Sequence, residues 1–150
     1  MTSPTTAAIL QDLIQRLGRS LLQYVAEAFP WATAREKETL VRVRKLVAEE
    51  QECAAARLGR FLQARHVSIP PLAPYPMAWT SMNFVSFDYL LPRLVDYQRQ
   101  IVAHVEKAAG SLWSDLEGRE LVQHVLEVAR QHLEKLEAMA KEARPVPASA

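Results

Sequence analysis

Cysteine is nearly absent from this 150-residue chain. Cys53 is the single cysteine, so no disulfide can form within the chain and no zinc site that needs several cysteines can be assembled. Glycine is also scarce, with 4 residues, whereas Ala, Leu, Glu, Arg and Gln are abundant. This composition favours helices, and strands are not expected.

A dominant charge and a long apolar run are missing as well. The chain has 18 Lys and Arg and 17 Asp and Glu residues, a formal net charge of +1, so no overall field would attract nucleic acid or an anionic membrane. No segment approaches the roughly 20 apolar residues that a membrane span needs. The N-terminal stretch has no basic leader, and Gln11 and Asp12 interrupt its apolar residues, unlike a secretory signal. We therefore expect a cytoplasmic protein that binds neither nucleic acid nor membrane.

Apolar residues recur at spacings of three and four in four long segments, as on one face of a helix. We expect helices over about 6–29, 33–66, 81–110 and 114–143. The length is typical of one domain, which we place at 1–143. The terminal sequence RPVPASA, residues 144–150, has no apolar periodicity and is expected to be disordered.

Two helix starts carry a capping-box spacing, in which a Ser or Thr is followed three residues later by Glu. Thr33 and Glu36 have this spacing before the second helix, and Ser114 and Glu117 have it before the fourth. Pro92 is expected to kink the third helix or to divide off its first turns, because proline lacks a backbone donor.

The segment 67–80 contains four prolines, which favour an extended path of about 3.1 Å per residue. Fourteen residues at that rise cover roughly 40 Å, the length of a helical bundle. We therefore expect an all-α four-helix bundle with two antiparallel hairpins and a long crossover, so that the second and third helices are parallel. The large side chains of the crossover, Tyr75, Met77, Trp79 and Met82, are expected to cover the side of the bundle.

Three side chains form the candidate site. Glu50 lies on the apolar stripe near the middle of the second helix, where a carboxylate is costly unless it is paired or bound to metal. Cys53 follows one turn later, and His132 lies on the stripe of the fourth helix at a similar depth. One interpretation is a hydrogen-bonded Glu50–His132 pair with Cys53 as an apolar filler. The other is a single softer metal ion bound by all three.

The sequences VAEEQECAAARLG and VARQHLEKLEAM, with the expected crossover topology, resemble small bacterial ferritin-like and rubrerythrin-like proteins. The resemblance implies a di-iron site built from Glu-x-x-His motifs and bridging carboxylates. Glu50 matches the first glutamate and His132 matches the second histidine, but Cys53 and Ala129 occupy the other two motif positions. The positions of the bridging carboxylates hold Leu13, Ile14 and Leu17 in the first helix and Leu94 and Gln98 in the third.

Two hard metal ions need several anionic oxygen ligands, which these residues do not supply. We therefore expect a ferritin-like bundle without its di-iron site and without a resident cofactor, acting as a non-catalytic binding or assembly module. A homodimer is expected, with the aromatic residues of the crossover as a candidate contact surface, and so is an unidentified protein partner. The alternative is a metal-binding ferritin-like protein or oxidoreductase, with iron or another transition metal at Glu50, Cys53 and His132. Gln23, Tyr24 and Glu27 are expected to form an ordinary solvated helix end.

Overall fold

The structure, a computed structural model, describes residues 3–28 and 30–143. Within these ranges the chain forms six α-helices, one π-helical segment and one 3-10 helix, and it contains no β-strand. The described residues contain one isolated parallel β-bridge, which joins Trp31 and Ser86. The prediction of an all-α protein is confirmed. The segment expected to be disordered, 144–150, lies outside the described residues.

The first long helix is divided in two. Helix α1 spans Pro4–Gly18 and α2 spans Leu21–Glu27, so the prediction of one helix over 6–29 is wrong. Ser20 lies between them with an extended backbone, and its hydroxyl accepts a hydrogen bond from the Gln23 backbone nitrogen at 3.2 Å. A serine that caps a following helix in this way interrupts the helix before it.

The second long helix begins and ends close to its predicted bounds. Helix α3 spans Ala34–Gln51, a π-helical segment η1 spans Glu52–Gly59, and α4 spans Arg60–Ala64. The capping box is confirmed, because Thr33 and Glu36 each accept the other's backbone N–H through a side-chain oxygen at 3.3 Å. The π-helical segment was not predicted, since it leaves no clear mark on the apolar spacing.

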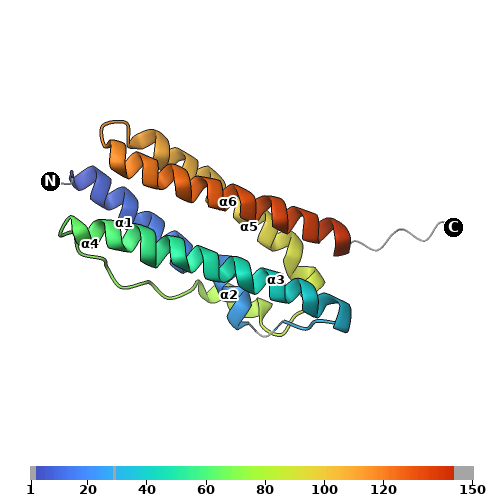
Figure 1. Cartoon of the computed structure of the whole chain (residues 1–150). Coiled ribbons are helices and arrows are strands. Elements are labelled where there is room, and N and C mark those ends of the chain that lie inside the picture. Colours follow the sequence, from blue (N-terminus) through green and yellow to red (C-terminus); the bar gives the residue numbers. More distant parts are fainter. Residues whose placement is uncertain (1–2, 29, 144–150) are drawn as a thin grey trace.

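The proline-rich connector runs beside the first helix. Side chains of α1 and of the residue after it donate to connector carbonyls in the same order along both segments: Gln11 to Ser68 at 2.8 Å, Gln15 to Pro71 at 2.8 Å and Arg19 to Ala73 at 2.7 Å. Figure 1 shows the connector passing along the length of the molecule before the next long helix starts. The 3-10 helix η2, Met77–Met82, ends this path.

The aromatic residues of the connector cover the side of the molecule, as predicted. The Tyr75 ring lies 5.1 Å from the Tyr24 ring, and the Trp79 ring lies 5.6 Å from the Tyr97 ring, between centroids. Met82 is buried as well. Met77 is the exception, with 84% of its surface exposed.

Helix α5 spans Phe87–Ser111 and α6 spans Leu116–Ala143. Helix α5 starts several residues later than predicted, because η2 occupies the preceding segment, and it continues through Pro92 without being divided. The predicted cap of α6 is wrong. Asp115, rather than Ser114, accepts the hydrogen bond from the Gly118 backbone nitrogen at 2.9 Å.

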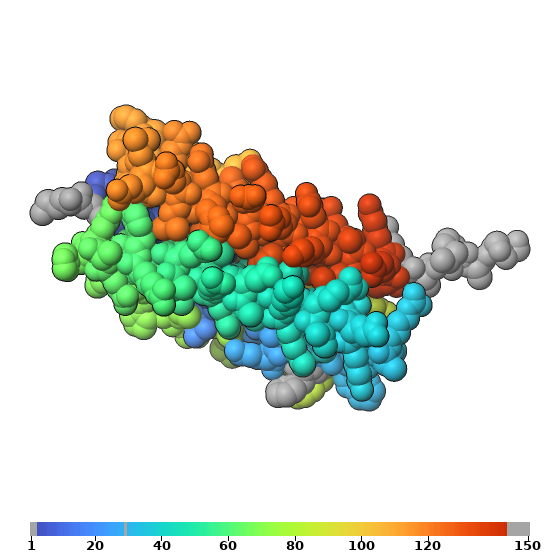
Figure 2. Space-filling view, in the orientation of Figure 1, coloured from blue at the N-terminus to red at the C-terminus, as the bar shows by residue number. Residues whose placement is uncertain are grey.

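Ion pairs show how the long helices run relative to α6. The pairs join Arg99 to Glu137, Arg130 to Glu106, Arg42 to Glu142 and Arg65 to Asp115. In each case residues further along α5, or along α3 to α4, meet residues nearer the start of α6. Helices α3 and α5 are therefore both antiparallel to α6 and parallel to each other, as Figure 1 shows. In Figure 2, α3 to α4 and α6 lie side by side on one face.

The hydrophobic core consists of two clusters that follow one another along the molecule. One lies among α1, η1, α4, the second half of α5 and the first half of α6, and the other among α2, α3 and the remaining halves of α5 and α6. Five buried polar residues lie between the clusters, whereas the buried Thr6 lies near the start of α1. We call these five residues the polar layer: Ser20, Gln23, Glu50, Gln98 and His132.

Candidate functional site

Glu50 is the central residue of the polar layer, and only 2% of its surface is exposed. Its Oε1 accepts hydrogen bonds from the Ser20 hydroxyl and from Gln23 Nε2, the latter at 3.1 Å. Its Oε2 is buried and has no hydrogen-bond partner in the described part of the chain. Burial raises the pKa of Glu50 to about 7, and the two donors oppose that rise.

Gln23 joins α2 to α3 and is a site residue that the sequence interpretation missed. It was expected at a solvated helix end, but it is buried. Its Nε2 also donates to the Val47 carbonyl at 3.0 Å, and its Oε1 accepts from Gln51 Nε2 at 2.8 Å. A signal was available, since Ser20 and Gln23 have the Ser-x-x-Gln spacing of a helix start.

His132 does not bond to Glu50, so the predicted pair is wrong. Its Nε2 lies 2.8 Å from Glu49 Oε2, and the Glu49 side chain is 34% exposed. Adjacent positions on a helix point about 100° apart, so Glu50 faces α2 whereas Glu49 reaches α6. Burial lowers the pKa of His132, and the hydrogen bond to His132 lowers the pKa of Glu49. A neutral imidazole that donates to a carboxylate fits both directions.

Cys53 is buried in the π-helical segment. Burial raises the pKa of its thiol to about 11, so without a bound metal the thiol stays protonated at neutral pH and is a poor nucleophile. Cys53 lines a small cavity of about 10 Å³ together with Glu50, Gln98 and His132. The structure thus brings the three predicted site residues to one place.

Among the described residues, no group of three or more His, Cys, Asp or Glu side chains is placed to hold a metal ion. Leu17 lines the cavity from the α1 side, and Gln98 donates to the Ala129 carbonyl at 3.0 Å. Neither of these two side chains carries a carboxylate.

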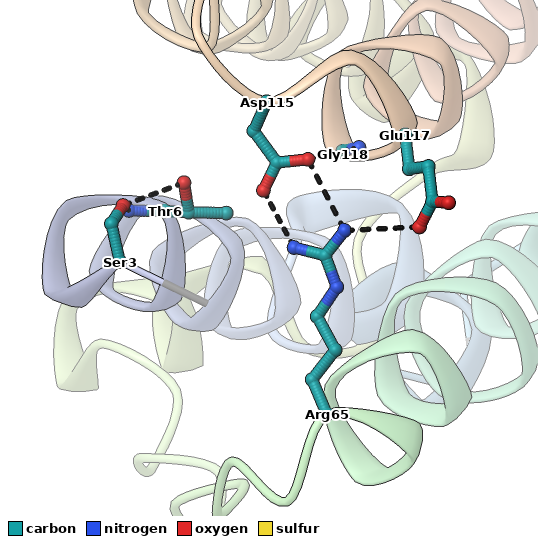
Figure 3. A network of polar contacts seen from close by, with 6 residues as sticks. All are labelled: Ser3, Thr6, Arg65, Asp115, Glu117 and Gly118. Carbon is teal, nitrogen blue, oxygen red and sulfur yellow. Dashed lines mark hydrogen bonds and ion pairs between the residues drawn. The ribbon is translucent and has the colours of Figure 1, made fainter. Parts of the chain in front are cut away.

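A second polar cluster joins the start of α6 to the end of α4 (Figure 3). Arg65 contacts Asp115 Oδ2 at 2.6 Å and Glu117 Oε2 at 3.2 Å, and its guanidinium lies 4.1 Å from the Phe61 ring centroid. The hydrogen bonds from Arg65 and from the Gly118 backbone lower the pKa of Asp115. This cluster has a structural role, because its charges are satisfied by one another and by a helix start.

Comparisons with protein-family models, with curated protein sequences and with solved structures find no match to this chain. In the part of the chain that the structure describes, a helix with the length and apolar character of a membrane span is not found.

Proposed function

We propose that this chain is a ferritin-like four-helix bundle that has lost its di-iron site and acts as a non-catalytic binding or assembly module. The four long helical parts, α1 to α2, α3 to α4, α5 and α6, with a crossover between the second and third, are compatible with that topology.

One observation carries the proposal. The side chains that the family resemblance assigns to metal make hydrogen bonds within the protein instead. Glu50 Oε1 accepts from Ser20 and Gln23, and His132 Nε2 bonds Glu49. Both side chains therefore have partners in the fold that do not depend on a metal.

Metal analysis tests this reading. We would express the protein with iron and manganese supplied, measure the metal content, and compare melting temperatures with and without a chelator. We expect less than stoichiometric metal and the same melting temperature. Stoichiometric metal together with a chelator-induced fall in melting temperature would refute the proposal.

The second candidate is a metal-binding protein or oxidoreductase of the ferritin-like class. The favouring observation is that Glu50, Cys53 and His132 line one cavity beside a π-helical segment, a feature frequent at functional sites. For this candidate, Cys53→Ser should reduce the metal content, whereas Ala54→Ser, on the neighbouring buried residue, should not.

We further propose that the module assembles with a second copy of itself through Trp31, whose side chain is 73% exposed. Backbone hydrogen bonds of 2.7 and 2.8 Å join Trp31 to Phe87 and Val85, so Trp31 is held in place. The net charge of +1 opposes self-association only weakly.

Light scattering in the micromolar range tests the homodimer. We expect a mass about twice the 16.9 kDa of one chain for the wild type, and a monomer for Trp31→Ser. Trp113→Ser is the matched control, because Trp113 is 77% exposed in the α5–α6 turn and should not affect the dimer. A wild-type monomer mass that does not change with concentration would defeat the proposal.

A further inference from the structure

Two features of the polar layer involve Glu50. The first is Glu50 Oε2, a buried carboxyl oxygen that has no hydrogen-bond partner among the described residues. The second is the cavity of about 10 Å³, which Glu50 lines. Buried oxygens of this kind are almost always satisfied in folded proteins, by protein groups or by ordered water.

The size and walls of the cavity limit what can bind there. A cavity of about 10 Å³ has room for one water molecule, and organic ligands need far more. The wall is mixed: Leu17, Val125 and Val128 are apolar, whereas Glu50, Gln98 and His132 carry polar atoms. A buried water needs two to four polar partners, and this wall contains enough polar side chains for it.

We propose that this cavity is a binding site for one water molecule, which is held by Glu50 Oε2 and by the Gln98 and His132 side chains from α5 and α6. The water completes the hydrogen bonds of the polar layer and links Glu50, which is anchored to α2, with the opposite pair of helices. This inference does not depend on the proposed function.

The charges around Glu50 fit such a water. Among the described residues, no Lys or Arg takes part in setting the pKa of Glu50. The charge of Glu50 raises the pKa of Cys53, Tyr75 and Tyr97, while Arg57, Arg19 and Arg16, respectively, lower these three pKa values. None of these arginines contributes to the pKa of Glu50 itself, and burial lowers the pKa of His132. In the proposed site, a water at Oε2 solvates the ionised carboxylate.

A high-resolution crystal structure of the full chain is the first test. We expect one density peak within hydrogen-bond distance of Glu50 Oε2 and of a polar atom of Gln98 or His132. A cavity without density would overturn the proposal. A peak with anomalous signal and shorter ligand distances would overturn it too, in favour of a metal ion.

A cavity-filling variant gives a second, solution readout. Ala129 lines the cavity, so Ala129→Val should displace the water and make ionisation of Glu50 harder. In a carbon-13 NMR titration of the Glu50 carboxyl we expect its midpoint to rise by about one pH unit or more. Ala109→Val is the control, since Ala109 is equally buried in α5 and does not line the cavity. Leu17→Phe fills the same space from α1 and replaces Ala129→Val where that variant does not fold. An unchanged midpoint in a folded cavity-filling variant would refute the role of the water.

Discussion

Glu50→Gln should change how the stability of this protein depends on pH. The pKa of Glu50 rises from an ordinary value of 4.5 to about 7 in the folded protein, because the carboxylate is buried. Between these two values the folded state binds more protons than the unfolded state, so the free energy of unfolding falls as pH rises and then levels off above about 7. Glutamine has no such proton, and its Oε1 can accept the same hydrogen bonds from Ser20 and Gln23.

The magnitude follows from the two pKa values. One pKa unit corresponds to about 1.4 kcal/mol, so this residue should reduce the stability of the wild type by roughly 2–3 kcal/mol between pH 5 and pH 8. Urea unfolding of both proteins at the two pH values measures it. The free energy of unfolding of Glu50→Gln minus that of the wild type should therefore increase by this amount from pH 5 to pH 8. His132 titrates in both proteins, so its contribution cancels in the difference.

Glu52→Gln is the matched control, because it removes an exposed carboxylate two residues away and should show a much smaller change. A Glu50→Gln difference that stays constant from pH 5 to pH 8 would show that Glu50 is not buried as an isolated carboxyl, and the reasoning would fail.

Three further changes test the contacts around the site and the helix ends by urea unfolding. His132→Leu should cost less than about 1.5 kcal/mol, since its partner Glu49 is partly exposed and can be solvated; a loss above about 3 kcal/mol would contradict this geometry. Arg65→Met should cost about 1–2 kcal/mol, because it breaks the partly buried ion pair with Asp115 shown in Figure 3. Arg42→Met removes an exposed ion pair with Glu142 and should cost under about 0.5 kcal/mol. His66→Gly should stabilise by about 0.5–1 kcal/mol, because the φ of His66 is 58°, and a loss of stability would show that its side chain has another role.

Most of the helix pattern could be predicted from the sequence, because apolar spacing and caps are local signals. The start of α3 at the Thr33 and Glu36 capping box is an example. The break between α1 and α2 was missed, because the apolar stripe continues across it. What ends α1 is Ser20, whose hydroxyl caps α2 and donates to Glu50, a residue 30 positions away. Such a contact depends on tertiary packing.

The candidate site was predicted in position but not in its bonds. The depth of Glu50, Cys53 and His132 follows from their place on apolar stripes, and all three line one cavity. The partner of His132 depends on which of two adjacent glutamates faces α6. The π-helical segment that follows departs from the ordinary α-helical periodicity, which apolar spacing alone does not reveal.

The polar layer also explains how the long helices keep their lengthwise alignment. The two hydrophobic clusters on either side are both rich in Leu and Val, so a helix shifted by one turn would still bury apolar side chains. The same shift would place the Glu50 carboxyl against apolar groups and strand its donors, at a cost of several kcal/mol. We infer that the layer selects one alignment among several that the apolar stripes permit. Glu50→Gln keeps these bonds, so its backbone amide NMR shifts should differ from the wild type only near the layer, and widespread differences would contradict this role.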